Sequence, residues 1–286
     1  MQDHLSRRMW RVTEPFHAIA YFASETRAAF DAAGLKGYWM GYFASRSAAM
    51  GPVPSEVVVA TFYNFHPDMV SRAIPDAWTF ATPVAVLEAR RNGMDAALRR
   101  ILGQMAESDE VLEAARLARR ATDACTLPGR PLFAAHARLS WPATPHMELW
   151  HACTLLREWR GDGHVTALSV AGLDGCEAHV ALSATGAVPR SSLEPFRGWS
   201  DQEWAAASQR LQARGWLDRR GRLTKEGGTA HALLEQRTDE LAAAPWRSLG
   251  DDGCKRLHEL MTTILRPVLA SDVVPYPNPI GVPRPD

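Results

Sequence analysis

Helical periodicity over most of the chain is the feature that most limits its fold. Four stretches carry apolar side chains at a spacing close to 3.6 residues: 83–103, 109–125, 200–214 and 229–243. Capping residues mark where several helices begin, because Thr82 precedes Pro83 and a capping box runs from Ser200 to Glu203. The sequence therefore predicts a mainly α protein.

One short segment has a different pattern. Residues 216–218 and 222–224 are typical of two short strands, and the basic turn 219–221 joins them. This pattern predicts a small β-hairpin in the second half of the chain. Thr224 is placed to cap the helix that follows it.

Prolines divide the chain into segments. Four of them fall within 126–145, between clear helical stretches, and five fall in the last twelve residues. The final segment cannot be helical, so we expect either a loose end or a strap along the surface. The expected division is an N-terminal domain 1–125, a linker 126–145, a C-terminal domain 146–272 and a proline-rich tail 273–286.

The two halves resemble each other. An aromatic–His–Ala core recurs 134 positions apart, with His17 in one copy and His151 in the other. Residues 44–54 resemble 181–189, and Ala77-Trp78-Thr79 resembles Gly198-Trp199-Ser200. We interpret this as an internal duplication, which normally pairs its copies about a pseudo-two-fold axis and leaves a cleft between them.

The second half has an order of elements typical of winged-helix proteins. A long helix around His151 is expected to break at Gly161–Gly163, with Asp162 capping the next helix from His164 to Gly172. A helix over 175–184 and another over 200–214 follow. The segment 211–217 then leads into the hairpin and a last helix.

The whole chain resembles an actinobacterial family of tandem MarR-like winged-helix proteins. The resemblance is carried by LWHACTLLREWRGDGH at 149–164, FASRSAAMGPVP at 43–54, FYNFHP at 62–67, and the RGWL and GRLT motifs at 214–217 and 221–224. It implies two winged-helix-like halves, with a β-wing in the second. The resemblance implies no particular activity.

Charge argues against a strong general attraction to nucleic acid. Lysine and arginine together number 32, as do aspartate and glutamate, and the stretch 161–189 contains neither lysine nor arginine. The basic turn is the exception. Its residues Arg219, Arg220 and Arg222 are the candidates for contacting DNA, in the alternative interpretation of the protein as a ligand-responsive regulator.

Polar side chains are densest at 157–164. In a helix His151 and Glu158 share one face two turns apart, roughly 10 Å along the axis, so they fit opposite ends of one pocket. The candidate catalytic residues are His151, Glu158, Asp162 and His164, with Arg157 and Arg160 as ligand-binding residues. A structural interpretation stays open, in which the arginines complement a helix end, Asp162 caps and His164 is exposed.

A second cluster combines aromatic rings with polar groups in the first half. Its candidate ligand-binding residues are His17, Tyr42, Arg46, Tyr63 and His66. Aromatic bodies with polar tips suit a flat organic ligand, and Arg46 suits a carboxylate or phosphate. His17 and His151 are expected to face each other across the cleft if the duplication holds. Core packing is the alternative for all of these rings.

These observations lead to one main functional hypothesis. We expect a small-molecule-binding protein or small enzyme, with an anionic or aromatic ligand in a cleft between the halves; His151 or Glu158 would act as acid or base. The four cysteines show no metal-binding spacing, and nucleotide-binding, zinc-protease and hydrolase motifs are missing, so no metal ligand or cofactor is identified. With no apolar leader or membrane-length stretch, we expect a cytoplasmic protein without a membrane partner. A homodimer stays open.

Overall fold

The computed structural model describes residues 4–282, 284 and 285, and the regular elements of this part are helical. The α-helices are α1 (Leu5–Phe22), α2 (Ser24–Ala32), α3 (Gly37–Ser47), α4 (Ser55–Phe62), α5 (Pro67–Ser71), α6 (Ala77–Phe80), α7 (Pro83–Leu102), α8 (Asp109–Thr122), α9 (Pro131–Ala137), α10 (Pro145–Val170), α11 (Gly175–Ala184), α12 (Asp201–Ala213), α13 (Lys225–Leu241) and α14 (Ala244–Ala270). The prediction of a mainly helical protein is confirmed. None of these helices is long and apolar enough to cross a membrane within the described residues.

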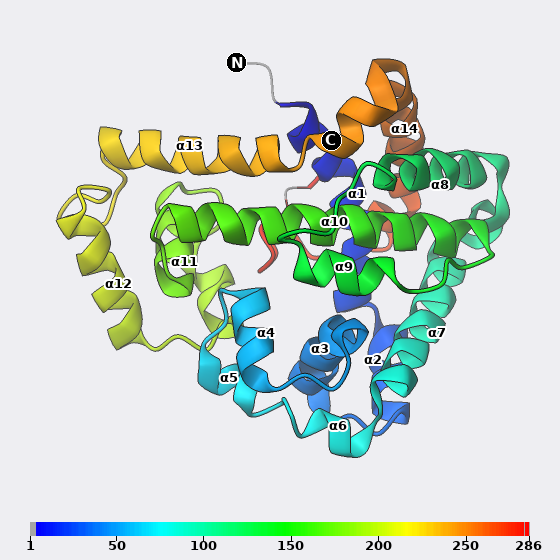
Figure 1. Cartoon of the computed structure of the whole chain (residues 1–286), viewed down its shortest axis with the longest axis horizontal. Helices are drawn as coiled ribbons and strands as arrows, with labels where there is room; N and C mark the ends of the chain where they lie inside the picture. The colour runs from blue at the N-terminus through cyan, green and yellow to red at the C-terminus, as the bar shows by residue number, and fades with distance from the viewer. Residues whose placement is uncertain (1–3, 283, 286) are drawn as a thin grey trace.

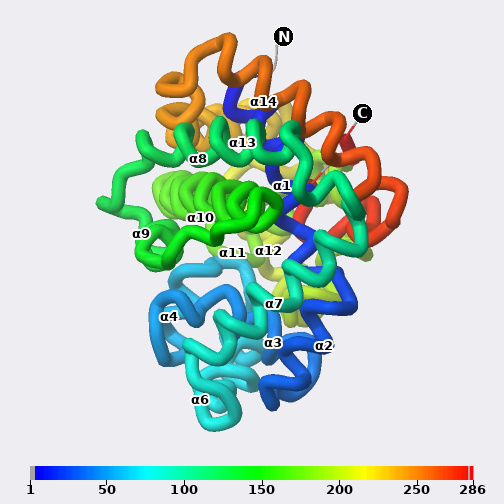
Figure 2. The backbone as a smooth tube through the Cα atoms, turned by 90° about the vertical axis from the view of Figure 1, so that its right-hand side faces the viewer, coloured from blue at the N-terminus to red at the C-terminus, as the bar shows by residue number. Residues whose placement is uncertain are grey.

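Helix α10 is the axis of the molecule. It crosses the centre of the structure, and α1, α8, α9 and α13 all pack against it (Figure 1). Figure 2 looks nearly along α10 and shows α8 and α13 on one side of it, with α3, α4 and α6 on the other. Residues from both ends of the chain therefore meet along one helix.

Local capping explains where several helices begin. The Thr82 side chain accepts a hydrogen bond from the Ala85 amide ahead of α7, and the predicted capping box of Ser200 and Glu203 begins α12. Thr224 caps α13 as predicted, through the amide of Gly227. These caps satisfy N–H groups that the first helical turn leaves without partners.

The predicted break at Gly161–Gly163 is wrong, because α10 continues unbroken through both glycines. The missing side chain at Gly163 instead lets the guanidinium of Arg130 pack closely against α10. A Cβ at Gly163 would lie 2.2 Å from Arg130 Nη1, and that guanidinium donates hydrogen bonds to the carbonyls of Trp159 and Leu241. Asp162 therefore begins no helix of its own. It accepts a hydrogen bond from the Phe133 amide, 2.9 Å away, at the start of α9.

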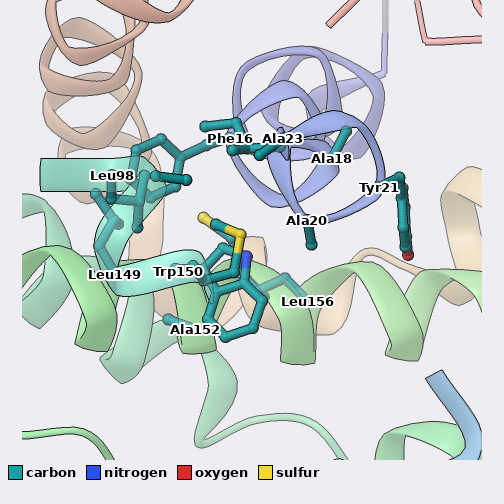
Figure 3. Packing of buried hydrophobic residues seen from close by; sticks show 14 of the residues in the cluster. Phe16, Ala18, Ala20, Tyr21, Ala23, Leu98, Leu149, Trp150, Ala152 and Leu156 are labelled. Carbon is teal, nitrogen blue, oxygen red and sulfur yellow. The ribbon is translucent and has the colours of Figure 1, made fainter. Parts of the chain in front are cut away.

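Two main hydrophobic cores lie along α10, beside a small cluster of Phe133, Leu155 and Trp159. The larger one packs α1, α3, α7 and α8 against the N-terminal half of α10 and includes α14. Figure 3 shows part of it, where Phe16 on α1 gathers with Leu98 on α7 and Leu149 on α10. The smaller core packs the C-terminal end of α10 with α11, α12 and α13. Neither this packing nor the fold tests the predicted domain boundaries, although α9 lies inside the predicted linker.

The hairpin is smaller than predicted. Within the described residues it reduces to a single antiparallel bridge between Leu217 and Leu223, closed by a turn in which Gly221 has φ +75°. The Asp218 amide donates to the Arg222 carbonyl, 2.8 Å away. Two strands of this length share too few hydrogen bonds to form a sheet. The β-wing and the internal duplication stay predictions.

The described part of the tail is a strap. Val274, Asn278 and Val282 are buried, so the segment is packed along the surface rather than loose. The Asn278 side chain holds its bend by two hydrogen bonds to the backbone of Val282, 2.8 and 3.1 Å long. Arg197 also donates to the carbonyl of Pro279.

Candidate functional site

A buried network of charged side chains lies at the centre of the molecule. Glu158 on α10 receives Arg157 at 2.7 Å and Arg46 of α3 at 3.4 Å, both on Oε2. Arg157 also reaches Glu14 of α1, with Nε 3.4 Å from Oε1. Arg46 donates to the hydroxyl of Tyr42, one turn away on α3. Three helices that are distant in sequence are thereby joined through the carboxylates of Glu158 and Glu14.

Burial and ion pairing act against each other on the carboxylates of this network. Burial alone raises the pKa of Glu158, but Arg157 and Arg46 reverse that effect and lower the pKa below its usual value. Burial also raises the pKa of Glu14, and Arg157 offsets only part of that rise. Glu158 is therefore an ionised anchor for two arginines. An acid–base role, as proposed from the sequence, would need a pKa closer to neutrality.

His17 and His151 do not form the predicted pair. The His17 ring shares hydrogen bonds with the Thr154 hydroxyl at 3.0 Å and the Tyr21 hydroxyl at 2.7 Å. The ring of His151 lies edge-on to Trp141, with centroids 4.7 Å apart. Burial lowers the pKa of both imidazoles, that of His151 to about 4, so both are neutral at pH 7.

A large cavity of about 900 Å³ opens on one side of this network; we call it the large cavity. Its walls come from α1, α10, α13, the end of α11 and the strap. Five arginines, two histidines and two glutamates line it: Arg7, Arg11, Arg157, Arg160, Arg284, His164, His231, Glu14 and Glu235. Of the predicted residues, Arg157, Arg160 and His164 meet here.

Ion pairs organise the wall formed by α1, α10 and α13. Arg7 pairs with Glu235 and with Asp239, whose Oδ1 is 3.2 Å from Nε. Arg160 Nη1 forms an ion pair with the same carboxylate, 2.8 Å from Asp239 Oδ1. His164 shares a hydrogen bond with the Thr238 hydroxyl at 3.0 Å, so it is not simply exposed.

A second cavity, of about 260 Å³, lies at the N-terminal half of α10; we call it the small cavity. Residues of α7, α9 and α10 line it, and it shares no lining residue with the large cavity. His151 belongs here together with Arg90 and His136. The four candidate catalytic residues are therefore not in one site. His164 lines the large cavity and His151 the small cavity, whereas Glu158 lies in the buried network and Asp162 contacts α9.

The remaining residues of the predicted aromatic wall connect helices. The Tyr63 hydroxyl donates to the carbonyl of Leu173, between α10 and α11. His66 shares a hydrogen bond of 2.8 Å with Glu203 at the start of α12. Neither residue lines either of these two cavities.

The predicted DNA-contacting turn is exposed but partly neutralised. Arg222 pairs with Asp218 at 2.8 Å, whereas Arg219 and Arg220 project into solvent. On α12 Arg210 pairs with Asp174 and Glu177. Only part of the local basic charge is therefore available to a phosphate backbone.

Most of the acidic and arginine partners were not predicted from the sequence. Glu14 lies three positions before His17, close to the aromatic–His–Ala motif, whereas Arg7, Arg90 and Asp239 lie on helix faces with no motif. These three residues matter because folding wholly or partly buries them against segments that are distant in the sequence. No three histidine, cysteine, aspartate or glutamate side chains come together to hold a metal ion within 4–282 and 284–285.

Comparisons with known proteins agree with the architecture at the family level. No curated protein and no solved structure matches the chain. A helix-turn-helix family matches residues 6–275, which is nearly the whole length. The chain belongs to this helix-turn-helix family.

Proposed function

We propose that this protein binds a small anionic organic molecule in the large cavity. The observation that carries the proposal is the cavity itself, about 900 Å³ with five arginines in its wall, among which Arg7, Arg157 and Arg160 are paired with carboxylates. Ligand sites for small organic molecules commonly measure some 300–1,000 Å³. The volume therefore suits a drug-sized ligand.

The lining favours a negatively charged ligand. Arg160 is mostly buried, and its guanidinium pairs with Asp239, which does not itself line the cavity. Guanidinium groups bind carboxylates and phosphates through strong charge-assisted hydrogen bonds. Trp10, Val188 and Ile280 add apolar surface for the body of the ligand.

A blocking variant provides the test. Gly161 lines the cavity from within α10, and a Cβ there has only Glu158 Oε2 nearby, at 3.9 Å, so Gly161→Trp fills space without a backbone clash. Gly228→Trp is the matched control, because Gly228 also lies inside a helix and has open space around it. The probe is the anionic dye 8-anilinonaphthalene-1-sulfonate, followed by fluorescence titration.

We expect Gly161→Trp to weaken dye binding at least about tenfold and Gly228→Trp to leave it unchanged. Equal binding by both variants and the parent protein would place the dye elsewhere and reject the large cavity as the site. Native mass spectrometry of the purified protein then identifies any ligand that copurifies.

DNA binding is the second candidate, and membership of the helix-turn-helix family favours it. Against it, the first turn of α12, the helix before the bridge, carries Asp201 and Glu203. A recognition helix contacts bases with its N-terminal residues, where acidic groups repel phosphate. Arg219 and Arg220 in the exposed turn are the remaining candidates for contacting the DNA backbone.

A salt-dependent gel-shift assay with DNA from upstream of the protein's own gene separates this candidate from the first. If the turn binds DNA, replacing both Arg219 and Arg220 by alanine weakens binding and reduces the salt slope by about 2. Replacing the exposed Arg72 and Arg247 by alanine is the charge-matched control. Identical curves for the two double variants would reject the turn as the DNA contact.

A further inference from the structure

The small cavity contains a buried cation, Arg90, that forms no ion pair with any carboxylate of the described residues. Arg90 on α7 is 4% exposed, and its only described hydrogen bond is from Nη1 to the carbonyl of Ser45, 3.5 Å away. Its guanidinium lies over the ring of Trp150, 4.9 Å from the centroid. Arg90 Nη2 is buried and has no hydrogen-bond partner within the described residues. A buried charge in this state is costly for the protein.

A second buried polar group lines the same cavity without a partner. His151 is 6% exposed, and its Nε2 makes no hydrogen bond among the described residues. Burial, Arg90 and Arg119 lower the pKa of His151 to about 4, so at neutral pH the ring carries one N–H and no charge. A neutral imidazole of this kind is able to donate one hydrogen bond to an anion.

The rest of the lining is largely apolar. Leu87, Leu139, Pro142 and Trp150 form its walls, and the exposed side chains of Glu88 and Arg91 lie at its α7 side. A volume of about 260 Å³ is at the lower end for organic ligands. The cavity therefore fits a molecule with one compact apolar body and one negatively charged group.

We propose that the small cavity is a second binding site, separate from the large cavity, for a small carboxylate with an apolar body. The carboxylate accepts hydrogen bonds from Arg90 Nη2 and from His151 Nε2–H, and the apolar body packs on Trp150 and Leu139. This ligand neutralises the buried guanidinium, which no carboxylate among the described residues does by direct contact. The proposal does not depend on the large cavity being occupied.

Benzoate is the probe, with benzamide as its uncharged counterpart, and isothermal titration calorimetry of the full chain is the measurement. We expect one benzoate per chain with a Kd of about 1 mM or tighter, and benzamide at least about tenfold weaker. Arg90→Gln removes the charge and should weaken benzoate binding at least about tenfold. No saturable binding of benzoate, or equal binding of benzamide, would overturn the proposal.

A second variant covers the case in which Arg90→Gln does not fold. Ser140 is exposed and lines the cavity, so Ser140→Trp obstructs it while Arg90 and His151 stay intact; the exposed Ser169→Trp on α10 is the matched control. Benzoate binding should be lost in Ser140→Trp and kept in Ser169→Trp and in Gly161→Trp. Loss in Gly161→Trp alone would assign benzoate to the large cavity, which overturns this proposal and supports the first.

Discussion

Arg46 on α3 and Glu158 on α10 are 112 positions apart in the sequence, and their side chains form a buried ion pair with 3.4 Å between Nη2 and Oε2. Arg157 contacts the same carboxylate oxygen from the neighbouring position of α10. One carboxylate thus holds two guanidinium groups where the first and second halves of the chain meet. Among the described residues, Glu158 is the carboxylate nearest to each of these arginines.

Replacing Glu158 by glutamine should strongly destabilise the protein. The substitution leaves Arg46 and Arg157 buried without their main counter-charge, and removing one partner of a buried pair costs about 3–5 kcal/mol. Urea unfolding at pH 7 measures the loss. Glu113→Gln, which breaks an exposed pair with Arg256, is the control and should change little. Similar effects of the two substitutions would contradict a central role for Glu158.

The pH dependence of Glu158 has a definite sign. Its pKa is lower in the folded protein than in the unfolded chain. Ionised Glu158 therefore contributes fully to the free energy of unfolding at neutral pH, and this contribution is lost as the pH falls through the pKa of the folded state. In Glu158→Gln this acid-dependent part should disappear from the stability curve.

His151 should make the protein sensitive to mild acid. Its ordinary pKa of 6.5 is lowered to about 4 by burial and by Arg90 and Arg119, so between these pH values only the unfolded chain binds the proton. Stability therefore falls as the pH drops from 6.5 to 4, by up to about 1.4 kcal/mol per pH unit for this residue. Asp162, whose pKa burial raises to about 6, acts in the opposite direction.

His151→Phe isolates this effect. Because His151 Nε2 has no hydrogen-bond partner in the described part of the chain, the substitution should cost little stability at pH 7 and flatten the stability curve below pH 6.5. Thermal unfolding across this pH range, compared with the parent protein, gives the difference. An unchanged slope would mean that the imidazole titrates normally in the folded state.

Two adjacent glycines on α13 should respond in opposite ways to alanine. A Cβ on Gly227 would lie 2.0 Å from the Trp216 carbonyl oxygen, a backbone atom that cannot move aside, whereas Gly228 has open space. Gly227→Ala should destabilise by about 1–3 kcal/mol or more, and Gly228→Ala should stabilise by up to about 1 kcal/mol through helix propensity. Chemical unfolding of both variants tests how closely the 216–224 segment packs on α13. Stabilisation by both would rule out the close approach.

Asn278 should control how firmly the strap is held over the large cavity. Its buried side chain makes two hydrogen bonds to Val282, and Asn278→Ala leaves those backbone groups without partners. We expect the free energy of local opening to fall by about 1–3 kcal/mol, seen as faster amide hydrogen exchange over 274–282. The exchange of α10 should not change. Uniform acceleration over the whole chain would indicate global destabilisation instead.

Helix positions were largely predictable because their signals are local. Thr82, Ser200 and Thr224 cap the helices expected of them, since a cap needs only the next three residues. The same local reasoning failed at Gly163, where the reason for glycine is the guanidinium of Arg130, more than thirty positions away in the chain. A glycine that breaks a helix and one that admits a neighbour look alike in a sequence.

The sequence by itself determined the helical class of the protein, the capped starts of α7, α12 and α13 and the irregular course of its tail, because propensity, capping and proline act within a few residues. Only the tertiary structure decided which polar side chains share a site. It paired Glu158 with Arg46, and it placed His151 in the small cavity with Arg90, while His17 bonds to Thr154 and Tyr21. These outcomes depend on burial and on contacts between distant segments. Desolvation and electrostatic interactions depend on distances in space, so their effect on each side chain is set only when the chain has folded.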